Sequence, residues 1–391
     1  MSVTKIDQLI IVGNGFDKSL GFPTSYREFL LFLLKKEFKN IAEKGNINGN
    51  LTSNTKYFYE DNLLFKFYFK KNFSINSFEK YINDKLKTKK DFDSFFKLEY
   101  VSFEYQSTFV SQLFSENENW GDIEICFFEN LKRMHPNPRD VELLNSQLWY
   151  IKKELVSYLS KFQLSPIKVS NFGPNKFKDC ISKKINSNVL DSKTSEKKII
   201  VSDRYFINFN YTNFLEDVIN NTSFKDSSDI ISIHGNIQDI QDIQDIKDNQ
   251  VIDSDIEVDL DDIIFGYGDE DNKDFDNLKN AGIDSLLKNI KTYNYQNNNN
   301  YKKLLGVLTR SKDFQVIIYG HSCSLSDRVL LREIFENDKC KSIRVLHHSG
   351  IDSYYRTIYN ISRIFKENRN VREKVESFDK SDKIPQDNLL Q

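Results

Sequence analysis

The stretch QLIIVGNGFD, residues 8 to 17, decides the fold. Its apolar run, Gln8 to Val12, stops at a glycine, which predicts a short buried strand of a parallel sheet. Phe and Leu residues at helical spacing follow over Tyr26 to Phe38. A strand, a glycine turn and a helix in this order predict the start of a doubly wound α/β fold, a Rossmann-like parallel sheet flanked by helices.

Further apolar runs predict the other strands of this sheet. These runs cover residues 198–201, 205–209, 230–233, 263–265, 315–319 and 342–346. We expect them to complete one nucleotide-binding domain that joins residues 8–38 to residues 198–350. The polar C-terminal tail, residues 366–391, is expected to fray.

The stretch between these parts, residues 40–198, contains no comparable buried strand. Its Phe, Tyr and Leu residues recur at helical spacing, for example over 65–73 and 141–162. This pattern predicts a large, mostly helical insertion that forms a cap domain.

An acidic segment, residues 236–276, carries fifteen Asp or Glu residues and two Lys residues. Such a composition is typical of a solvated loop, and a functional gate is the alternative. The charge argues against a phosphate backbone lying on that face.

The overall composition is that of an ordinary globular protein. The chain has 391 residues, 39% hydrophobic and 29% charged, with a formal net charge of −2. This balance gives no electrostatic reason to expect nucleic acid or a membrane as a partner. No apolar run approaches the ~18 residues of a membrane span, and the N-terminal residues do not form a secretion signal. We therefore expect a cytoplasmic protein.

The cysteines show no metal-binding pattern. Cys126, Cys180, Cys323 and Cys340 form no CxxC pair, and no His lies at ligand spacing from them. Because a structural zinc needs four converging ligands, no metal is expected, and the thiols are predicted to be reduced and buried.

Polar residues or glycines follow several of the predicted strands. They are Asn210, His234-Gly235, Gly266 and Gly320-His321-Ser322. In open α/β sheets ligands bind outside the carboxyl ends of the strands, at a topological switch point. The repeated pattern therefore predicts a site at this edge.

The first glycine loop, Gly13 to Asp17, has features of a nucleotide site. Gly13 permits a tight turn, and Gly15 lets the backbone approach a pyrophosphate. Asn14 and Asp17 are polar where a buried turn would not need polar side chains. The alternative is that the glycines only make a turn.

The residues that follow the later strands also have structural alternatives. Asn210 can simply cap the turn before a helix that begins near Thr212 or Asn213. A lone histidine at a strand end, such as His234, is often structural.

Several motifs together resemble one family. GNGFDKSLGFPTSYREFL, INFNYTNFLE, SIHGN, IIFGYG and IIYGHSCSLSD are similar, in order and spacing, to motifs of the AbiH family of bacterial abortive-infection proteins. WGDIE, at Trp120 to Glu124, fits a further motif in the insertion of that family. The resemblance covers residues 8 to 335 and implies an antiphage effector. We expect Asp122 and Glu124 to be structural; closing over the site is the alternative.

A more distant resemblance is to SIR2-like NAD-binding domains. Their GAGxS loop, followed by GIP, is similar to the register of Gly13, Gly15, Gly21 and Pro23. Their TTNYDxLLE is similar to the stretch from Asn208 to Glu216. Their general-base His-Gly is similar to His234-Gly235, and their GYSxxD to Gly320-His321-Ser322 with Asp327.

Three departures from the SIR2-like pattern bear on the activity. Thr212 replaces an Asp, and Thr24 stands where sirtuins place an Asp. The zinc module of the protein deacylases is absent, so a deacylase does not fit.

The resemblance implies NAD as the substrate of an NAD glycohydrolase, without a metal. Asn210 and His234 are the implied catalytic residues. The implied nucleotide-binding residues are Gly13, Asn14, Gly15, Phe16, Asp17, Thr24, Tyr211, Gly266, Gly320, His321, Ser322 and Asp327. A homo-oligomer and a phage-derived trigger are compatible with this role. The alternative, which Thr212 favours, is a nucleotide-binding sensor or a nucleic-acid-acting effector without NAD hydrolysis.

Overall fold

The computed structural model divides the chain into two compact units. One combines Met1–Thr24 with Leu159–Gln391, and the other is Ser25–Tyr158. The structure describes residues 3–47, 57–59, 63–69, 101–115, 120–134, 137–162, 174–183, 185, 198–222, 224, 228–239 and 260–387. The domain limits expected from the sequence stay a prediction. The middle of the acidic segment, residues 240–259, lies outside the described residues.

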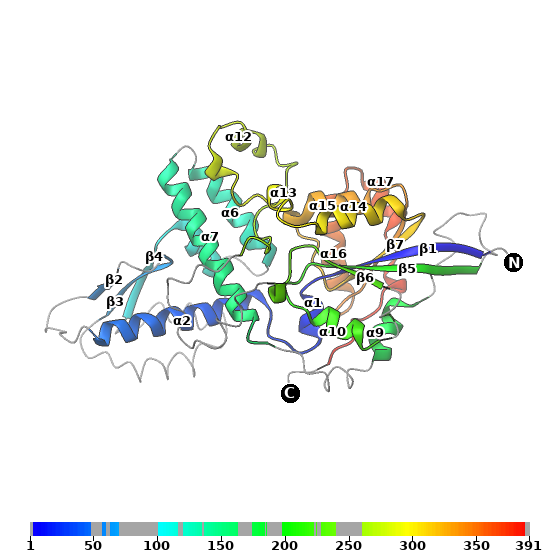
Figure 1. Ribbon diagram of the computed structural model, residues 1–391, viewed down its shortest axis with the longest axis horizontal. Helices are drawn as coiled ribbons and strands as arrows, with labels where there is room; N and C mark the ends of the chain where they lie inside the picture. Colours follow the sequence, from blue (N-terminus) through cyan, green and yellow to red (C-terminus); the bar gives the residue numbers. More distant parts are fainter. Residues whose placement is uncertain are drawn as a thin grey trace. The chain divides into compact units, whose positions relative to one another are not determined.

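The first unit is built on a five-stranded parallel sheet with the strand order β6-β5-β1-β7-β8 (Figure 1). Its strands are β1 (Val3–Val12), β5 (Lys198–Asn208), β6 (Ser228–Ser232), β7 (Phe314–Tyr319) and β8 (Cys340–Val345). Flanking helices cover both faces, so the predicted Rossmann-like α/β fold is confirmed.

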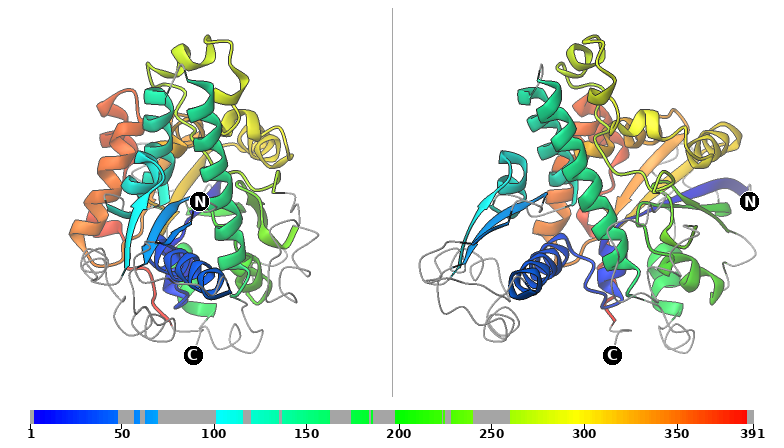
Figure 2. Two further views of the ribbon diagram at one scale, coloured as in Figure 1. Left: turned by 90° about the vertical axis from the view of Figure 1, so that its left-hand side faces the viewer. Right: turned by 60° about the vertical axis from the view of Figure 1, so that its left-hand side comes forward.

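The alternation of side chains along β1 explains the two layers of helices. Leu9 and Ile11 belong to one core cluster, and Ile10 and Val12 belong to the other. Helices α14 (Asn300–Arg310), α15 (Arg328–Phe335) and α16 (Ile351–Ile364) pack on the first face. Helices α1 (Gly15–Ser19), α9 (Pro174–Ile181) and α10 (Phe214–Asn220) pack on the second (Figures 1 and 2). Because the carboxyl-terminal part of β1 is buried on both faces, Leu9 to Val12 form a continuous apolar run.

The order of the strands fixes a topological switch point between β1 and β7. After β1 the chain adds β5 and then β6 on one side, and it then returns to add β7 and β8 on the other. The carboxyl ends of β1 and β7 are therefore the place where this sheet is expected to bind a ligand.

The structure differs from the predicted strands in two places. The two strands predicted over 198–201 and 205–209 form one continuous strand, β5, which ends at Asn208. Residues 263–265 were predicted as a strand, and this is wrong, because they lie in a turn segment outside the sheet. Ile263, Ile264 and Phe265 are nevertheless buried, so their apolar character reflects packing of a loop rather than strand pairing.

The second unit contains helices and a small antiparallel sheet. Its helices are α2 (Tyr26–Ile47), α5 (Thr108–Ser115), α6 (Trp120–Met134) and α7 (Pro138–Leu159), and its strands are β2 (Tyr57–Tyr59), β3 (Phe65–Phe69) and β4 (Val101–Tyr105). The helix predicted over 141–162 is confirmed as α7, but helical structure over 65–69 is wrong. The stretch FKFYF is rich in aromatic residues, which favour strands, and it forms the central strand β3. Residues 70–73 lie outside the described residues.

Residues 366–387 of the C-terminal tail are ordered, contrary to the expectation that the tail frays. It forms α17 (Asn368–Lys374), and Val375 and Lys383 then make parallel bridges to Ile343 and His347. Glu376 N also donates to Ile343 O at 2.9 Å. The tail therefore covers the otherwise open edge of β8, a place where a sheet gains from protection.

The remaining short elements are α12 (Phe275–Lys279), α13 (Lys291–Asn294), η2 (Ile237–Asp239), η3 (Asp284–Leu286), η4 (Leu325–Asp327) and η5 (Phe378–Lys380). Within the described residues, no helix combines the length and apolar character needed to cross a membrane.

Truncation of one tail residue should show that the tail is part of the fold. Ile384 is 0% exposed and packs in the second core cluster. Ile384→Ala should therefore lower the free energy of unfolding by about 2–5 kcal/mol, measured by urea denaturation. The same substitution at Ile351, which is 49% exposed, should change it by less than about 0.5 kcal/mol. Equal effects of the two substitutions would contradict a packed tail.

Candidate functional site

The two loops at the switch point are joined backbone to backbone. Gly13 N donates to Tyr319 O at 3.1 Å, and Gly15 N donates to Gly320 O at 2.9 Å. A Cβ atom on Gly15 would lie 2.6 Å from Gly320 Cα, and Gly320 has a φ of +70°. Both positions therefore need glycine for this close approach.

This contact gives the first glycine loop a structural role. The amides of Gly13, Gly15 and Phe16 donate to the carbonyls of Tyr319, Gly320 and Gly13. These three donors are thus used inside the fold. The pyrophosphate contact expected at this loop stays a prediction.

Asp17 links the first loop to the loop that follows β5. Its Oδ1 accepts a hydrogen bond from Asn210 Nδ2 at 2.8 Å, and its Oδ2 accepts one from Thr212 Oγ1 at 2.7 Å. Asn210 Nδ2 also lies 3.2 Å from Gly13 O, to which it donates. Burial raises the pKa of the Asp17 carboxyl to about 7, against the lowering effect of the two hydrogen bonds. Polar side chains from two motifs therefore form one buried cluster.

A second buried cluster surrounds Asp327, which ends η4. Its Oδ1 lies 2.7 Å from Lys291 Nζ and 3.3 Å from His234 Nε2, and its Oδ2 lies 3.7 Å from His321 Nε2. Burial alone would raise the pKa of Asp327. The charge of Lys291, and after it the interactions with His234 and His321, lower this pKa by more, so it lies well below its usual range. The carboxyl group is therefore ionised at neutral pH.

The surroundings of His321 fix its protonation state. Its Nδ1 accepts a hydrogen bond from Cys323 N at 3.0 Å, so a neutral ring carries its proton on Nε2, facing Asp327. Burial lowers the pKa of His321 to about 4, so the ring is neutral at pH 7. Cys323 has a φ of +54°, an uncommon conformation for a residue with a side chain.

Aromatic packing connects the two clusters. The Phe209 ring centroid lies 4.2 Å from that of His321 and 5.1 Å from that of His234. Asn210 follows Phe209 directly. The structure therefore brings the predicted residues Gly13, Gly15, Asp17, Asn210, His234, Gly320, His321 and Asp327 together at the carboxyl edge of the sheet.

Other predicted site residues have contacts of their own. Asn14 Oδ1 accepts a hydrogen bond from the buried Thr24 at 2.6 Å, which closes the first loop. Phe16 is fully buried and packs edge-on against Phe177 and Tyr319 in the core.

Three more predicted residues lie in the later loops. The Tyr211 ring stacks on the His234 ring, with the ring centroids 6.1 Å apart, and its hydroxyl donates a hydrogen bond to Ile264 O. Gly266 lies against Asn289. Ser322 is exposed, and its carbonyl accepts from Asn360 of α16.

The insertion motif has a packing role inside the second unit. Trp120 begins α6 and packs against Tyr26 and Phe29 of α2, with ring centroids 5.5 and 5.4 Å apart. Glu124 is buried in the same helix.

Sequence reasoning missed Lys291, which is only 1% exposed. A single lysine in a polar stretch carries no pattern that separates it from surface lysines. The sequence motifs identified the two histidines and Asp327 as site residues, but they did not identify the lysine that pairs with Asp327.

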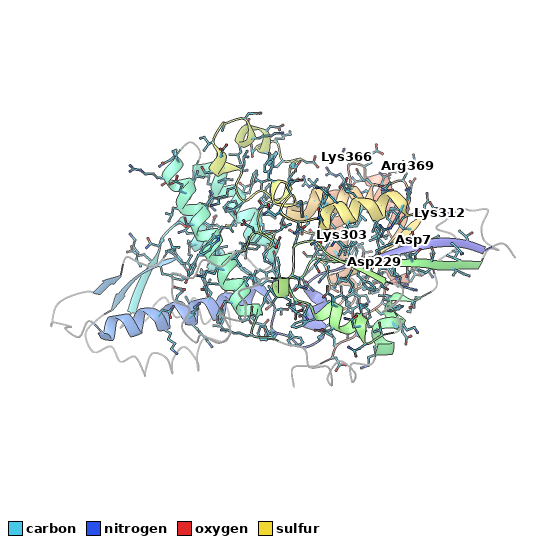
Figure 3. The ribbon with its side chains drawn as sticks, in the orientation of Figure 1. Asp7, Asp229, Lys303, Lys312, Lys366 and Arg369 are labelled. Atoms are coloured by element: carbon cyan, nitrogen blue, oxygen red, sulfur yellow. The ribbon has the colours of Figure 1, made fainter. Side chains whose placement is uncertain are left out.

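A hollow of about 750 Å³ lies away from these clusters. It is lined by β6, α10 and α14, with Asp229 and Lys303 among its walls (Figure 3). None of its lining residues belongs to the two buried clusters, so the hollow and the clusters are separate features.

All four cysteines are buried and unpaired, as predicted. In the described part of the chain, no group of three or more His, Cys, Asp or Glu side chains is arranged to hold a metal ion.

A comparison with protein-family models identifies the family of the chain. A family model described as bacteriophage abortive infection AbiH matches residues 9–348. The chain belongs to the AbiH family. Membership implies a role for this AbiH protein in bacteriophage abortive infection. Comparisons with curated proteins and with solved structures give no match.

The contact between Gly15 and Gly320 in this AbiH protein can be tested with two Gly→Ala substitutions that should change stability in opposite directions. Gly15→Ala should destabilise the protein by about 1–3 kcal/mol, because its Cβ would meet the Gly320 backbone. Gly306→Ala, in the open middle of α14, should stabilise it by about 1 kcal/mol. Urea denaturation measures both. A neutral Gly15→Ala would refute the tight contact.

The raised pKa of Asp17 predicts a pH dependence of stability. Between about pH 4 and pH 7 the folded chain keeps a proton that the unfolded chain has lost, so stability falls as the pH rises through this window. The shift of about three pKa units corresponds to a loss of the order of 4 kcal/mol.

Asp17→Asn should abolish this loss, because the amide has the same shape and does not titrate in this window. Urea denaturation of both proteins from pH 4 to pH 8 provides the test. Parallel stability curves for the two proteins would show that Asp17 has an ordinary pKa.

Proposed function

We propose that this protein serves in abortive infection by hydrolysing NAD at the nicotinamide–ribose bond. The observation that carries the proposal is the imidazole of His234. It stands at the carboxyl edge of the sheet with Nε2 3.3 Å from the ionised carboxylate of Asp327. An imidazole oriented by a buried carboxylate is the usual arrangement of a general base.

The proposed reaction needs few protein groups. Nicotinamide leaves from a pyridinium as a neutral molecule, so no general acid is required, in contrast to ordinary glycosides. The protein must hold the ribose, stabilise an oxocarbenium-like transition state and activate water or a ribose hydroxyl.

His234 fits the role of the base. An ionised carboxylate only accepts hydrogen bonds, so the His234 nitrogen that faces Asp327 carries the proton. The lone pair then lies on Nδ1, which makes Nδ1 the atom that takes a proton from water or a hydroxyl. A general base of this kind contributes ~10²–10⁴-fold to the rate.

Asn210 fits the role of a positioning group. Its Nδ2 donates to Asp17 Oδ1 and Gly13 O, which fixes the plane of the amide. Its Oδ1 is then the atom that can accept a hydrogen bond from a ribose hydroxyl or from the attacking water.

The Thr212 departure is compatible with a SIR2-like site. In the SIR2-like motifs, the position of Asp17 is a Ser and the position of Thr212 is an Asp. Here the hydroxyl and the carboxylate have exchanged places, and Thr212 Oγ1 donates to Asp17 Oδ2 at 2.7 Å. The exchange keeps one hydroxyl and one carboxylate between the two loops, so Thr212 no longer favours a different activity.

Substitution of His234 tests the proposal. His234→Ala should lower NAD turnover by ~10²-fold or more, because the base acts mainly in the transition state. The affinity for NAD should change little, because the base is not needed for binding. Nicotinamide release measures turnover, and calorimetry measures affinity. Asn210→Ala should act similarly, and the double variant should be little worse than either single variant.

His347→Ala is the matched control, because His347 follows β8 at the same edge but lies outside the Asp327 cluster. It should keep normal turnover per folded molecule. A stable and fully active His234→Ala protein would exclude the mechanism. A wild-type protein that binds NAD without releasing nicotinamide would support a nucleotide sensor instead.

A further inference from the structure

The IIFGYG motif has no role in the chemistry above, and its contacts suggest one. Tyr267 N donates to Asn289 O at 3.1 Å, and Lys291 N donates to Tyr267 O at 2.8 Å. A Cβ atom on Gly266 would lie 2.1 Å from Asn289 O. Glycine at 266 therefore allows the segment that carries Lys291 to lie directly against the motif.

The second glycine of the motif makes room for the Lys291 side chain itself. A Cβ atom on Gly268 would lie 2.5 Å from Ser326 O and 3.1 Å from Lys291 Cδ. The lysine stem thus packs over Gly268 beside the residue that precedes Asp327. Its ammonium group ends 2.7 Å from Asp327 Oδ1.

The buried ammonium has an electrostatic effect on the whole cluster. A buried carboxylate without a cation would take a proton or would draw one onto a neighbouring imidazole. Lys291 supplies the positive charge, so Asp327 stays ionised beside His234 and His321. Burial, rather than Lys291, is the main reason why the pKa of His321 is lowered to about 4.

We propose that the GYG segment delivers Lys291 to Asp327, and that Lys291 is a positioning residue that keeps Asp327 a hydrogen-bond acceptor, so that the carboxylate orients the Nε2–H groups of His234 and His321. The proposal rests on the proposed function only for its link to turnover. The groups that face the two rings are Asp327 from η4, Lys291 from α13, the Tyr295 hydroxyl and Cys323.

Histidine titrations provide a test that does not need activity. The chain has only five histidines, so NMR spectra of protein with labelled histidine are simple. Lys291→Met should raise the pKa of His321 above about 4, because the neighbouring positive charge of Lys291 is lost while the Asp327 carboxylate still raises it. Lys288→Met, the same change at a nearby exposed lysine, should leave the titration unchanged. An unchanged His321 titration in folded Lys291→Met would overturn the proposal.

A double variant keeps the test decisive if Lys291→Met does not fold. Lys291→Met combined with Asp327→Asn leaves no unpaired buried charge, so the fold should recover. The neutral amide can donate as well as accept, so the tautomer of His234 is no longer fixed, and turnover should fall ~10²-fold with little change in KM. A stable double variant with normal turnover and unchanged imidazole signals would mean that Lys291 only supports stability.

The two proposals can fail separately. If the wild type does not hydrolyse NAD, the proposed function is wrong, while the His321 titration still decides the role of Lys291. If the wild type hydrolyses NAD and Lys291→Met leaves the titration unchanged, only the role of Lys291 is wrong.

Discussion

The contact between Gly15 and Gly320 is the constraint on which the carboxyl edge of the sheet depends. It holds the loop after β1 against the loop after β7, at the point where the strand order reverses. A side chain at either position would separate the two loops, because each glycine faces backbone atoms that cannot move aside. With the loops in contact, Gly13 lies against His321, and Asn210 reaches the carbonyl of Gly13.

The pKa values of two buried carboxyl groups near this contact are shifted in opposite directions. Asp17 receives hydrogen bonds from neutral groups, and burial raises its pKa to about 7. Asp327 receives a lysine ammonium, which outweighs burial and keeps it ionised. The difference follows from the partners, since a neutral donor stabilises a carboxylate less than a cation does. One edge of the sheet therefore holds one carboxyl group that can titrate near neutral pH and one that cannot.

The sequence predicts the elements whose pattern is local and fails where packing decides. β1 and β7 are buried on both faces, so their apolar runs were recognisable, as were the polar residues at their ends. The buried loop 263–265 has the same apolar pattern without strand pairing. The ordered tail and Lys291 escaped prediction for a different reason. The tail is held by backbone bridges to Ile343 and His347, and Lys291 is held by its ion pair with Asp327 and by contacts with the GYG segment. Neither kind of contact leaves a periodic pattern in the sequence.

The central place of β1 in the sheet sets the route by which the chain can fold. Val12 pairs with Asn208 on one side and with Tyr319 on the other, so both neighbours of the first strand lie far along the chain. Closing such long loops costs entropy before any strand contact compensates, which makes folding of parallel sheets slow. The α5–α6 and β3–β4 contacts of the second unit join segments much closer in sequence, so that unit can form while β1 still lacks both partners. Until β5 and β7 pair with it, β1 exposes apolar side chains and unpaired backbone groups to other chains. The protein is therefore most prone to aggregate before its sheet closes.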